Sequence, residues 1–372
     1  MSRAHKPRSR DAQHRDNRTA PSLNKSFGKF KAVDDVSFAA AEGKITALLG
    51  PSGSGKSTVL RMIAGLESVD SGQSYLGGDE QTFQSVQDRR VGFVFQHYAL
   101  FRHMTVRQNV AFGLAVRKEA KDSRIKRVDE LLELVQLGPF AHRFPDQLSG
   151  GAEATSRPRA RALAPRPQVL LLDEPFGALD ARVRQDLREW LDRLHRELGI
   201  TSQLVTHDQE EALELADQIV FMHEGRVQQI GTSDDVYNHP AAPFIAGFVG
   251  AANVIEGLAI GGRVQFGEQH LAGAAHLKDG TPAHAYIRQH DVHLSSTPLS
   301  GLSSTATVER IASLGWMSKV HLELPGEQHV TATVRNGELI GVKEGQGIYV
   351  DLRNAKIFAP EESLPSDELA VM

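Results

Sequence analysis

Mostly apolar runs alternate with amphipathic stretches over the first two thirds of the chain. Strands are expected at 44–49, 91–95, 168–172 and 202–206, each a short run rich in apolar or β-favouring residues. A helix is expected to begin at Ser57, directly after the first strand. This order of strands and helices predicts an α/β domain.

Two stretches of this domain carry apolar stripes at helical spacing. The region 97–147 is expected to be helical, and a further helix is expected to end at Gly199. The first stripe consists of Ile125, Val128, Leu131, Leu132 and Val135, and the second of Val183, Leu187, Trp190, Leu191, Leu194 and Leu198. Both stripes are interpreted as core.

The pattern changes after Gly231. Residues 239–252 are interpreted as a linker because they begin with a proline-rich stretch. Short alternating segments separated by glycine turns then run to residue 360, which predicts a small β-barrel (OB-like) or sandwich. The predicted organisation is a disordered basic tail at 1–22, an α/β domain at 23–238 with a helical subdomain at about 97–150, the linker at 239–252, a β domain at 253–360 and a tail at 361–372.

Composition narrows the functional classes. The net charge of −4 gives no sign of a nucleic-acid binder, although a basic arm for lipid or nucleic acid is the alternative reading of the N-terminal tail. There is no cysteine, which excludes disulfides and thiolate-bound metals. No apolar run approaches the ~18 residues that span a bilayer, and the N-terminus lacks the apolar stretch of a secretory signal. A membrane role therefore requires partner chains.

A glycine-rich loop follows the first strand and fits the pattern G-x-x-x-x-G-K-[ST]. The candidate phosphate-binding residues are Gly50, Pro51, Ser52, Gly53, Ser54, Gly55, Lys56, Ser57 and Thr58. Glycines let backbone N–H groups turn toward phosphate oxygens, and the helix that follows adds its positive end. Lys56 is expected to place its charge on the β- and γ-phosphates, and the Ser57 hydroxyl to coordinate magnesium.

Polar residues end three other strands. Asp173 and Glu174 follow four apolar residues, so Asp173 is the candidate for the magnesium shell and Glu174 for the base that activates water. Gln96 and His207 are expected beside the γ-phosphate, and Asp208 is expected to cap the next helix. The loop alone also fits kinases and GTPases. The other strand ends discriminate between these classes, because a polar residue at each of them would surround the γ-phosphate, although each such residue alone is more often structural.

Taken together, the motifs resemble those of the ATP-binding subunit of an ATP-binding cassette (ABC) transporter. The matching segments are the phosphate loop, Gln96, Leu148-Ser-Gly-Gly151, Val169 to Pro175, Gly177-Ala-Leu-Asp180 and His207. The resemblance runs from about Leu23 to Phe358 and implies a P-loop ATPase domain followed by a C-terminal barrel of the kind importer ATPases carry.

The resemblance also implies a mechanism that uses ATP and Mg²⁺. Two copies would pack head to tail, so that Ser149, Gly150 and Gly151 of one bind the γ-phosphate held by the other. Phe27 would stack on adenine, Asp180 would couple the two sites, and Ser57, Gln96 and Asp173 would form the metal site. Closure and hydrolysis would drive two integral membrane permease subunits and, indirectly, a solute-binding protein, from the cytoplasmic face of the inner membrane.

A narrower resemblance concerns the transported solute. The stretch Val91-Gly-Phe-Val-Phe-Gln-His-Tyr-Ala-Leu-Phe-Arg-His-Met-Thr-Val106 is similar to the sulfate/thiosulfate importers. The resemblance implies that this stretch belongs to the face that meets the membrane subunits, so that it would follow transporter type without touching the anion. ATPases of molybdate, polyamine and sugar importers share the remaining motifs and stay open as alternatives.

One segment departs from the family pattern. The family continues Leu-Ser-Gly-Gly with Gln-Arg-Gln-Arg-Val-Ala-Leu, whereas residues 152–159 here read Ala-Glu-Ala-Thr-Ser-Arg-Pro-Arg, one residue longer. A single-base shift through suitably chosen codons converts one sequence into the other, which favours a local, compensated frameshift, in the gene or in its reported sequence. Pro158 would disrupt the expected helix and Glu153 would place negative charge near phosphate.

This departure creates an alternative to an active transport ATPase, namely a subunit that binds nucleotide but hydrolyses it weakly. The start of the chain departs as well, since residues 18–23 make a poor strand where the family has an apolar one. A soluble cassette ATPase of repair or translation is a further rival. Proteins of that class usually carry two cassettes, long coiled coils or zinc modules, and none is visible in this sequence.

Overall fold

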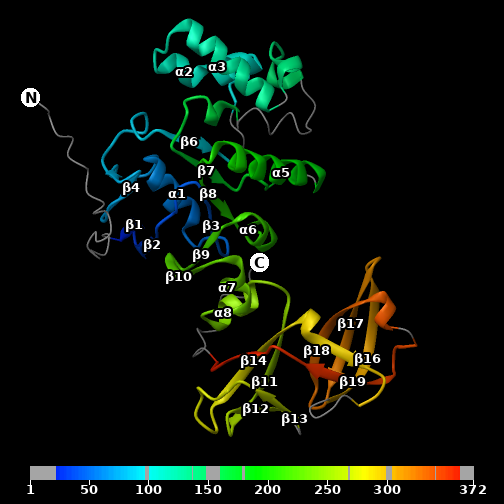
Figure 1. Cartoon of the computed structure of the whole chain (residues 1–372). Coiled ribbons are helices and arrows are strands. Elements are labelled where there is room, and N and C mark those ends of the chain that lie inside the picture. The colour runs from blue at the N-terminus through cyan, green and yellow to red at the C-terminus, as the bar shows by residue number, and fades with distance from the viewer. Residues whose placement is uncertain are drawn as a thin grey trace, which may run out of the picture. The chain divides into compact units, whose positions relative to one another are not determined.

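The computed structural model describes residues 22–96, 100–135, 137–147, 160–177, 181–266, 269–298, 304–339 and 341–360 (Figure 1). Contacts between residues divide the chain into two compact units. The first unit comprises Met1–Gly43, Pro51–Val205 and His223–Val227, and the second comprises Lys44–Gly50, Thr206–Met222 and Gln228–Met372. In the described part of the chain, no helix is both long and apolar enough to cross a membrane.

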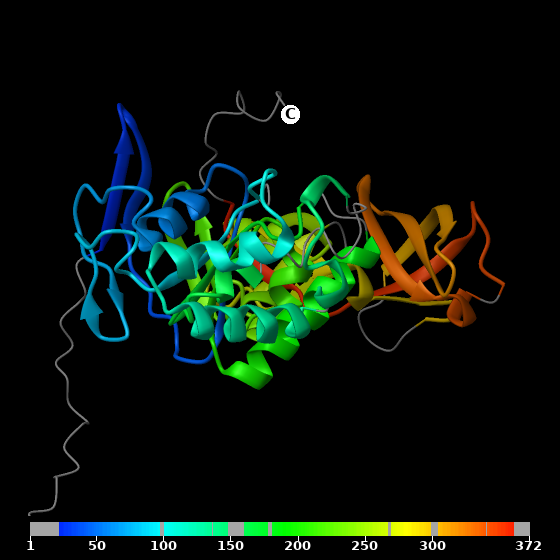
Figure 2. The same ribbon diagram turned by 90° about the horizontal axis from the view of Figure 1, so that it is seen from above.

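The strands of the first unit form one parallel group and two hairpins. The parallel group has the order β8-β7-β6, and its members are β6 (Val91–Val94), β7 (Val169–Asp173) and β8 (Thr201–Thr206), which ends at the unit boundary. Every residue of β7 is buried, as expected for a parallel strand covered on both faces. The hairpins are β1 (Leu23–Phe27) with β2 (Phe30–Val36), and β4 (Tyr75–Leu76) with β5 (Asp79–Glu80). The β1–β2 hairpin projects from its unit in Figure 2.

Helices of the first unit follow the predicted stripes with one correction. Those whose bounds lie within the described residues are α1 (Lys56–Ala64), α2 (Val106–Val116), α3 (Lys121–Leu134) and α5 (Ala181–Leu198), together with the short 3₁₀ turns η1 (Gly138–Phe140) and η2 (Pro145–Gln147). Helices α2 and α3 lie side by side (Figures 1 and 2). Ile125 was expected in the core but is 45% exposed, because the buried face of α3 carries Val128, Leu131 and Leu132 instead. On α5 the predicted stripe is buried from Val183 to Leu194.

The second unit begins with the strand that precedes the glycine-rich loop. Its parallel pair is β3 (Ile45–Leu49) with β9 (Gln218–His223), and β10 (Arg226–Gly231) lies beside β9. Its helices are α6 (Gln209–Leu215), α7 (Ser233–Asn238) and α8 (Pro243–Phe248). The apolar side chains of β3, β9 and α8 share one core. Part of the stretch interpreted as a linker is therefore a helix, since α8 buries Ile245 and Ala246.

The C-terminal part of the second unit is a small β domain, as the sequence predicts. Its two five-stranded antiparallel sheets have the orders β13-β12-β11-β14-β20 and β15-β19-β16-β17-β18. Their members are β11 (Ala252–Ile260), β12 (Arg263–Phe266), β13 (Gln269–Ala272), β14 (Pro282–Arg288), β15 (Val292–Ser295), β16 (Ser304–Ser313), β17 (Met317–Leu324), β18 (Gln328–Arg335), β19 (Gly347–Leu352) and β20 (Lys356–Phe358), with 3₁₀ turns η3 (Gln289–Asp291) and η4 (Asn336–Leu339). Burial alternates along β17, and one apolar core unites both sheets.

Candidate functional site

The glycine-rich loop joins the end of β3 to the start of α1. Gly53 and Gly55 have φ angles of 81° and 92°, a left-handed conformation that favours glycine. A Cβ atom on Gly55 would lie 2.3 Å from the carbonyl oxygen of Ala32, so this position accepts no larger residue without a shift of the backbone. The loop therefore has the backbone freedom and tight packing that a phosphate cradle requires.

The first turn of α1 is suited to an anion. Its N-cap, Gly55, offers no side-chain cap, and the first turn contains no acidic residue. The N–H groups of a helix start and the helix dipole together favour negative charge at such a position. The residues present thus fit a bound phosphate group.

Lys56 brings a buried positive charge to this loop. The residue is 4% exposed, and its Nζ donates to the carbonyl oxygen of Pro51 at 2.7 Å and to Oγ of Ser54 at 3.2 Å. Burial lowers the pKa of Lys56, while the negative charges of Glu174 and Asp173 act in the opposite direction. The ammonium group therefore lies within the electrostatic range of both candidate carboxylates.

The structure brings Ser57 and Asp173 into direct contact. Ser57 Oγ donates to Asp173 Oδ1 at 2.7 Å, and the Asp173 residue is only 2% exposed. A hydroxyl and a carboxylate at this distance are a donor set suited to a hard divalent cation such as Mg²⁺. The two residues are 116 positions apart in the chain, so the contact depends on the fold.

The second predicted acid, Glu174, is held by Gln96. Gln96 Nε2 donates to Glu174 Oε2 at 2.9 Å. The backbone of Glu174 has a φ angle of 45°, and its N–H donates to the carbonyl oxygen of Val205 at 3.0 Å. A left-handed conformation is uncommon outside glycine and is found preferentially at functional sites.

His207 is exposed and directly follows β8. Val205, two residues earlier, is the register partner of Asp173 on β7. Asp208 caps α6 as expected, since its carboxylate accepts hydrogen bonds from the N–H groups of Glu210 and Glu211 at 2.9 and 3.3 Å. The predicted role of His207 beside the γ-phosphate stays a prediction.

Phe27 presents an aromatic ring to solvent. It ends β1, is 49% exposed, and pairs across the hairpin with Phe30, which is 61% exposed. The ammonium group of Lys25 lies 5.4 Å from the centre of the Phe27 ring. An exposed ring of this kind can stack on a flat base.

Only some of the remaining predicted site residues lie in the part of the chain that the structure describes. Ser52 is exposed in the loop, and Thr58 lies on α1 directly after Ser57 in the chain. Several predicted positions lie outside the described residues: Ser149, Gly150, Gly151, Asp180 and the altered segment 152–159. Their roles stay predictions.

One residue of this site, Arg61, was not predicted from the sequence. Arg61 Nη2 contacts Asp173 Oδ2 at 3.3 Å. The spacing in the sequence could have indicated Arg61, because it follows Ser57 by four residues and therefore lies on the same face of the helix as Ser57.

Comparisons with known proteins agree with this geometry. The family model described as ABC transporter matches residues 33–177. A sulfate/thiosulfate import ATP-binding protein, CysA, of Thermosynechococcus vestitus is 48% identical over 91% of this chain and 97% of that relative. The chain belongs to the family of ABC transporter ATP-binding proteins.

Other members of the ABC family show the same likeness. CysA 1 of Chromobacterium violaceum, also a sulfate/thiosulfate import ATP-binding protein, is 48% identical over 91% of this chain and 96% of that relative. The dimeric structure of MJ0796, a bacterial ABC transporter cassette, is 31% identical with a TM-score of 0.51, covering 58% of this chain and 97% of the cassette. A second dimeric structure of MJ0796 is described as a post-hydrolysis state bound to ADP and Pi.

Proposed function

We propose that this chain is the ATP-binding and ATP-hydrolysing subunit of an ABC importer that energises sulfate/thiosulfate uptake through partner membrane subunits. The contact between Ser57 and Asp173 carries the proposal, because it joins the glycine-rich loop to the acidic strand end beside buried Lys56. The solute is supported by the curated relatives, which are named as sulfate/thiosulfate import proteins and match most of the chain.

The phosphates would be held by the loop Gly50 to Thr58. Lys56, already buried beside two carboxylates, would exchange its bonds to loop oxygens for bonds to the β- and γ-phosphates. Ser57 and Asp173, with Gln96, would hold the Mg²⁺ ion that the family uses. When bound, this ion would neutralise charge that develops on the phosphates during transfer.

Hydrolysis would depend on Glu174. Its carboxylate would accept a proton from the attacking water and orient that water toward the γ-phosphate. Gln96 would keep the carboxylate in place through the bond at 2.9 Å, and the His207 side chain would contact the γ-phosphate. Phe27 would stack on the adenine ring.

We propose the partner proteins from the resemblance to the family. A second copy would pack head to tail, and its Ser149, Gly150 and Gly151 would complete the γ-phosphate site, with Asp180 coupling the two sites. The solved MJ0796 cassettes are described as dimeric, which supports the pairing of two copies. Two integral membrane permease subunits would hold the dimer peripherally at the cytoplasmic face of the inner membrane and would receive solute from a binding protein.

The altered segment 152–159 supports a second candidate function, a subunit that binds ATP but hydrolyses it weakly. ATPases of molybdate, polyamine or sugar importers are the alternatives for the solute. The ATPases of these other importers would differ from a sulfate/thiosulfate importer only in the imported solute. The chemistry at Asp173 and Glu174 would be the same.

Two measurements test the proposal. Purified protein is assayed for binding of a fluorescent ATP analogue and for magnesium-dependent phosphate release, with Glu174→Gln as the matched inactive control. The chain is then expressed with cognate permease subunits in cells that lack sulfate uptake, and ³⁵S-sulfate accumulation is followed. Binding, release and uptake support the importer; binding without release supports the impaired subunit. Absence of ATP binding would contradict both.

A further inference from the structure

The buried carboxylate of Asp173 contacts one face of α1 through both of its oxygens. Oδ1 accepts a hydrogen bond from Ser57 Oγ at 2.7 Å, and Oδ2 contacts Arg61 Nη2 at 3.3 Å. The two partners are one helical turn apart, so a single face of α1 supplies both. One contact is a neutral hydroxyl and the other a permanent positive charge.

The positive charge of Arg61 offsets the negative charge of the Asp173 carboxylate. An ionised carboxylate that is 2% exposed requires a nearby cation or several hydrogen bonds. Lys56 adds a buried positive charge to the same site, and its Nζ donates to the Pro51 carbonyl oxygen and to Oγ of Ser54. Arg61 is a cation in direct contact with the Asp173 carboxylate.

The Arg61 side chain is also able to move away from Asp173. It is 51% exposed, whereas the Asp173 side chain is 3% exposed. A long, flexible side chain that already reaches solvent can move away while the buried carboxylate stays fixed on its strand.

We infer that Arg61 is a stand-in counter-ion for Asp173, which neutralises the carboxylate in the nucleotide-free protein and competes there with Mg²⁺. The inference rests on the proposed function, because it requires Mg²⁺ and ATP at this site. Two cations beside one poorly hydrated carboxylate repel each other, so Arg61 weakens magnesium binding and magnesium displaces Arg61. By linkage, each lowers the affinity of the site for the other to the same extent.

A purely structural role predicts a different outcome. Arg61 lies in the last turn of α1, where a positive charge stabilises the carbonyl end of the helix. That contribution would be the same with and without magnesium and nucleotide. Stability and magnesium affinity, measured together, therefore separate the two roles.

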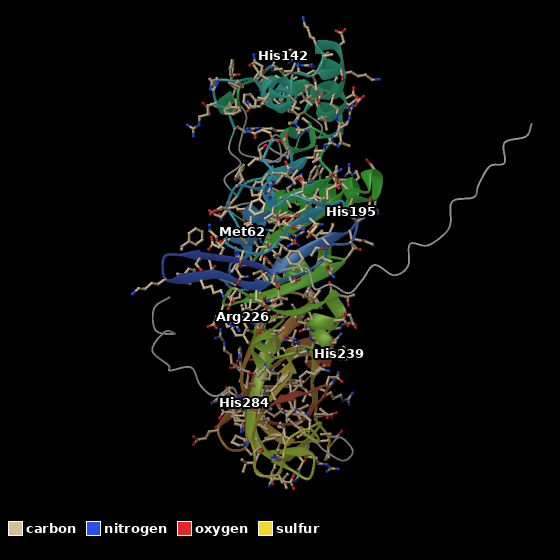
Figure 3. All side chains as sticks on the ribbon, turned by 90° about the vertical axis from the view of Figure 1, so that its left-hand side faces the viewer. Met62, His142, His195, Arg226, His239 and His284 are labelled. Carbon is tan, nitrogen blue, oxygen red and sulfur yellow. The ribbon has the colours of Figure 1, made fainter. Side chains whose placement is uncertain are left out.

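The test uses the full-length chain and the fluorescent analogue mant-ATP. Nucleotide is added in EDTA, Mg²⁺ is titrated, and the magnesium concentration at half-saturation is compared for the wild type, Arg61→Met and Arg61→Lys. Arg226→Met is the matched control, since Arg226 is likewise an exposed arginine bonded to an aspartate, Asp34, at 2.7 Å. Figure 3 shows Arg226 well away from Met62, the residue after Arg61.

We expect Arg61→Met to lower the half-saturating magnesium concentration by about five- to tenfold, a modest coupling between linked sites. Arg61→Lys and Arg226→Met are expected to stay within about twofold of the wild type, because the first keeps the charge and the second leaves Asp173 untouched. An unchanged or raised value for Arg61→Met would overturn the inference.

Thermal melts give an independent readout. The loss of melting temperature caused by Arg61→Met should shrink when Mg²⁺ and ATP are present, since the metal then neutralises Asp173. An equal loss in both conditions identifies a helix-end charge and overturns the inference. If Arg61→Met does not fold, Arg61→Gln replaces it in both measurements. Failure of the wild type to bind mant-ATP would instead contradict the proposed function, and the inference with it.

Discussion

Gln96 donates a hydrogen bond from Nε2 to Oε2 of Glu174 over 2.9 Å. The two residues follow β6 and β7, which are parallel neighbours with Val94 opposite Leu172. The carboxyl ends of parallel strands meet at one edge of a sheet, so both side chains emerge at the same place. Glu174 is fixed further by its left-handed backbone and its bond to Val205. The orientation of this carboxylate is thus determined by several contacts at once.

Glu174→Gln should stop hydrolysis and preserve nucleotide binding. The amide has nearly the same shape and can still bond to Gln96, but it cannot accept a proton from water. We expect phosphate release to fall by ~10² or more, with ATP affinity unchanged. Single-turnover assays and mant-ATP binding measure the two effects. The exposed Glu80→Gln is the control, and equal losses in both variants would contradict a catalytic role for Glu174.

Gly55→Ala should be far more damaging than Gly53→Ala. Both glycines have positive φ angles, so both substitutions carry a backbone penalty of roughly 1–2 kcal/mol. Only at Gly55 would the new methyl group meet the Ala32 carbonyl oxygen at 2.3 Å; at Gly53 no atom beyond the glycine and its two chain neighbours would lie within 4 Å of the methyl group. Chemical denaturation and ATP binding should show the difference. Equal destabilisation would mean that the backbone angle alone decides the cost.

Lys56→Met should stabilise the nucleotide-free protein and remove ATP binding. Burial lowers the pKa of Lys56 below its ordinary value of 10.5, so the charged form is disfavoured in the folded state. The unfolded chain then holds its proton more tightly, and wild-type stability rises as the pH climbs through the lowered pKa toward 10.5. The advantage of the variant should therefore be largest near neutral pH and shrink in that alkaline window. Denaturation at several pH values tests this sign, and an advantage that grows with pH would contradict it.

The sequence predicts the parts of this site that are local. The glycine-rich loop is contiguous with Lys56 and Ser57. Four apolar residues before Asp173 predict the buried strand that ends there. Contacts between elements are harder to predict, because the bond between Gln96 and Glu174 depends on which strands are neighbours. The prediction that Ile125 is buried is wrong for a related reason. Its spacing along the helix places it in the apolar stripe, but the packing of α3 against its neighbours decides where the buried face ends.

Arg89 is expected to hold the end of α1. It is 4% exposed and donates to four carbonyl oxygens, two of them, on Met62 and Ile63, in the last turn of the helix. Arg89→Met would leave these buried acceptors without a charged donor, which should destabilise the protein by about 3 kcal/mol or more. Urea denaturation measures the loss. The exposed neighbour Arg90→Met should change stability by no more than about 0.5 kcal/mol.

Restoring the family sequence in the altered segment should raise hydrolysis. The variant replaces residues 152–159 by Gln-Arg-Gln-Arg-Val-Ala-Leu, which removes Pro158 and Glu153 from a stretch expected to form a helix facing the partner's γ-phosphate. A proline inside a helix costs about 3 kcal/mol, and a negative charge near phosphate adds repulsion. We expect magnesium-dependent phosphate release to increase at least tenfold, while ATP affinity of the isolated loop site stays within about twofold.

The control for this variant carries Glu174→Gln in addition, so that any gain in release is assigned to this active site. Analytical ultracentrifugation with ATP and the Glu174→Gln background should also show more dimer when the segment is restored, because closure requires both copies. Equal turnover and equal dimer with either segment would show that residues 152–159 tolerate the change, and the impaired-subunit hypothesis would then be wrong.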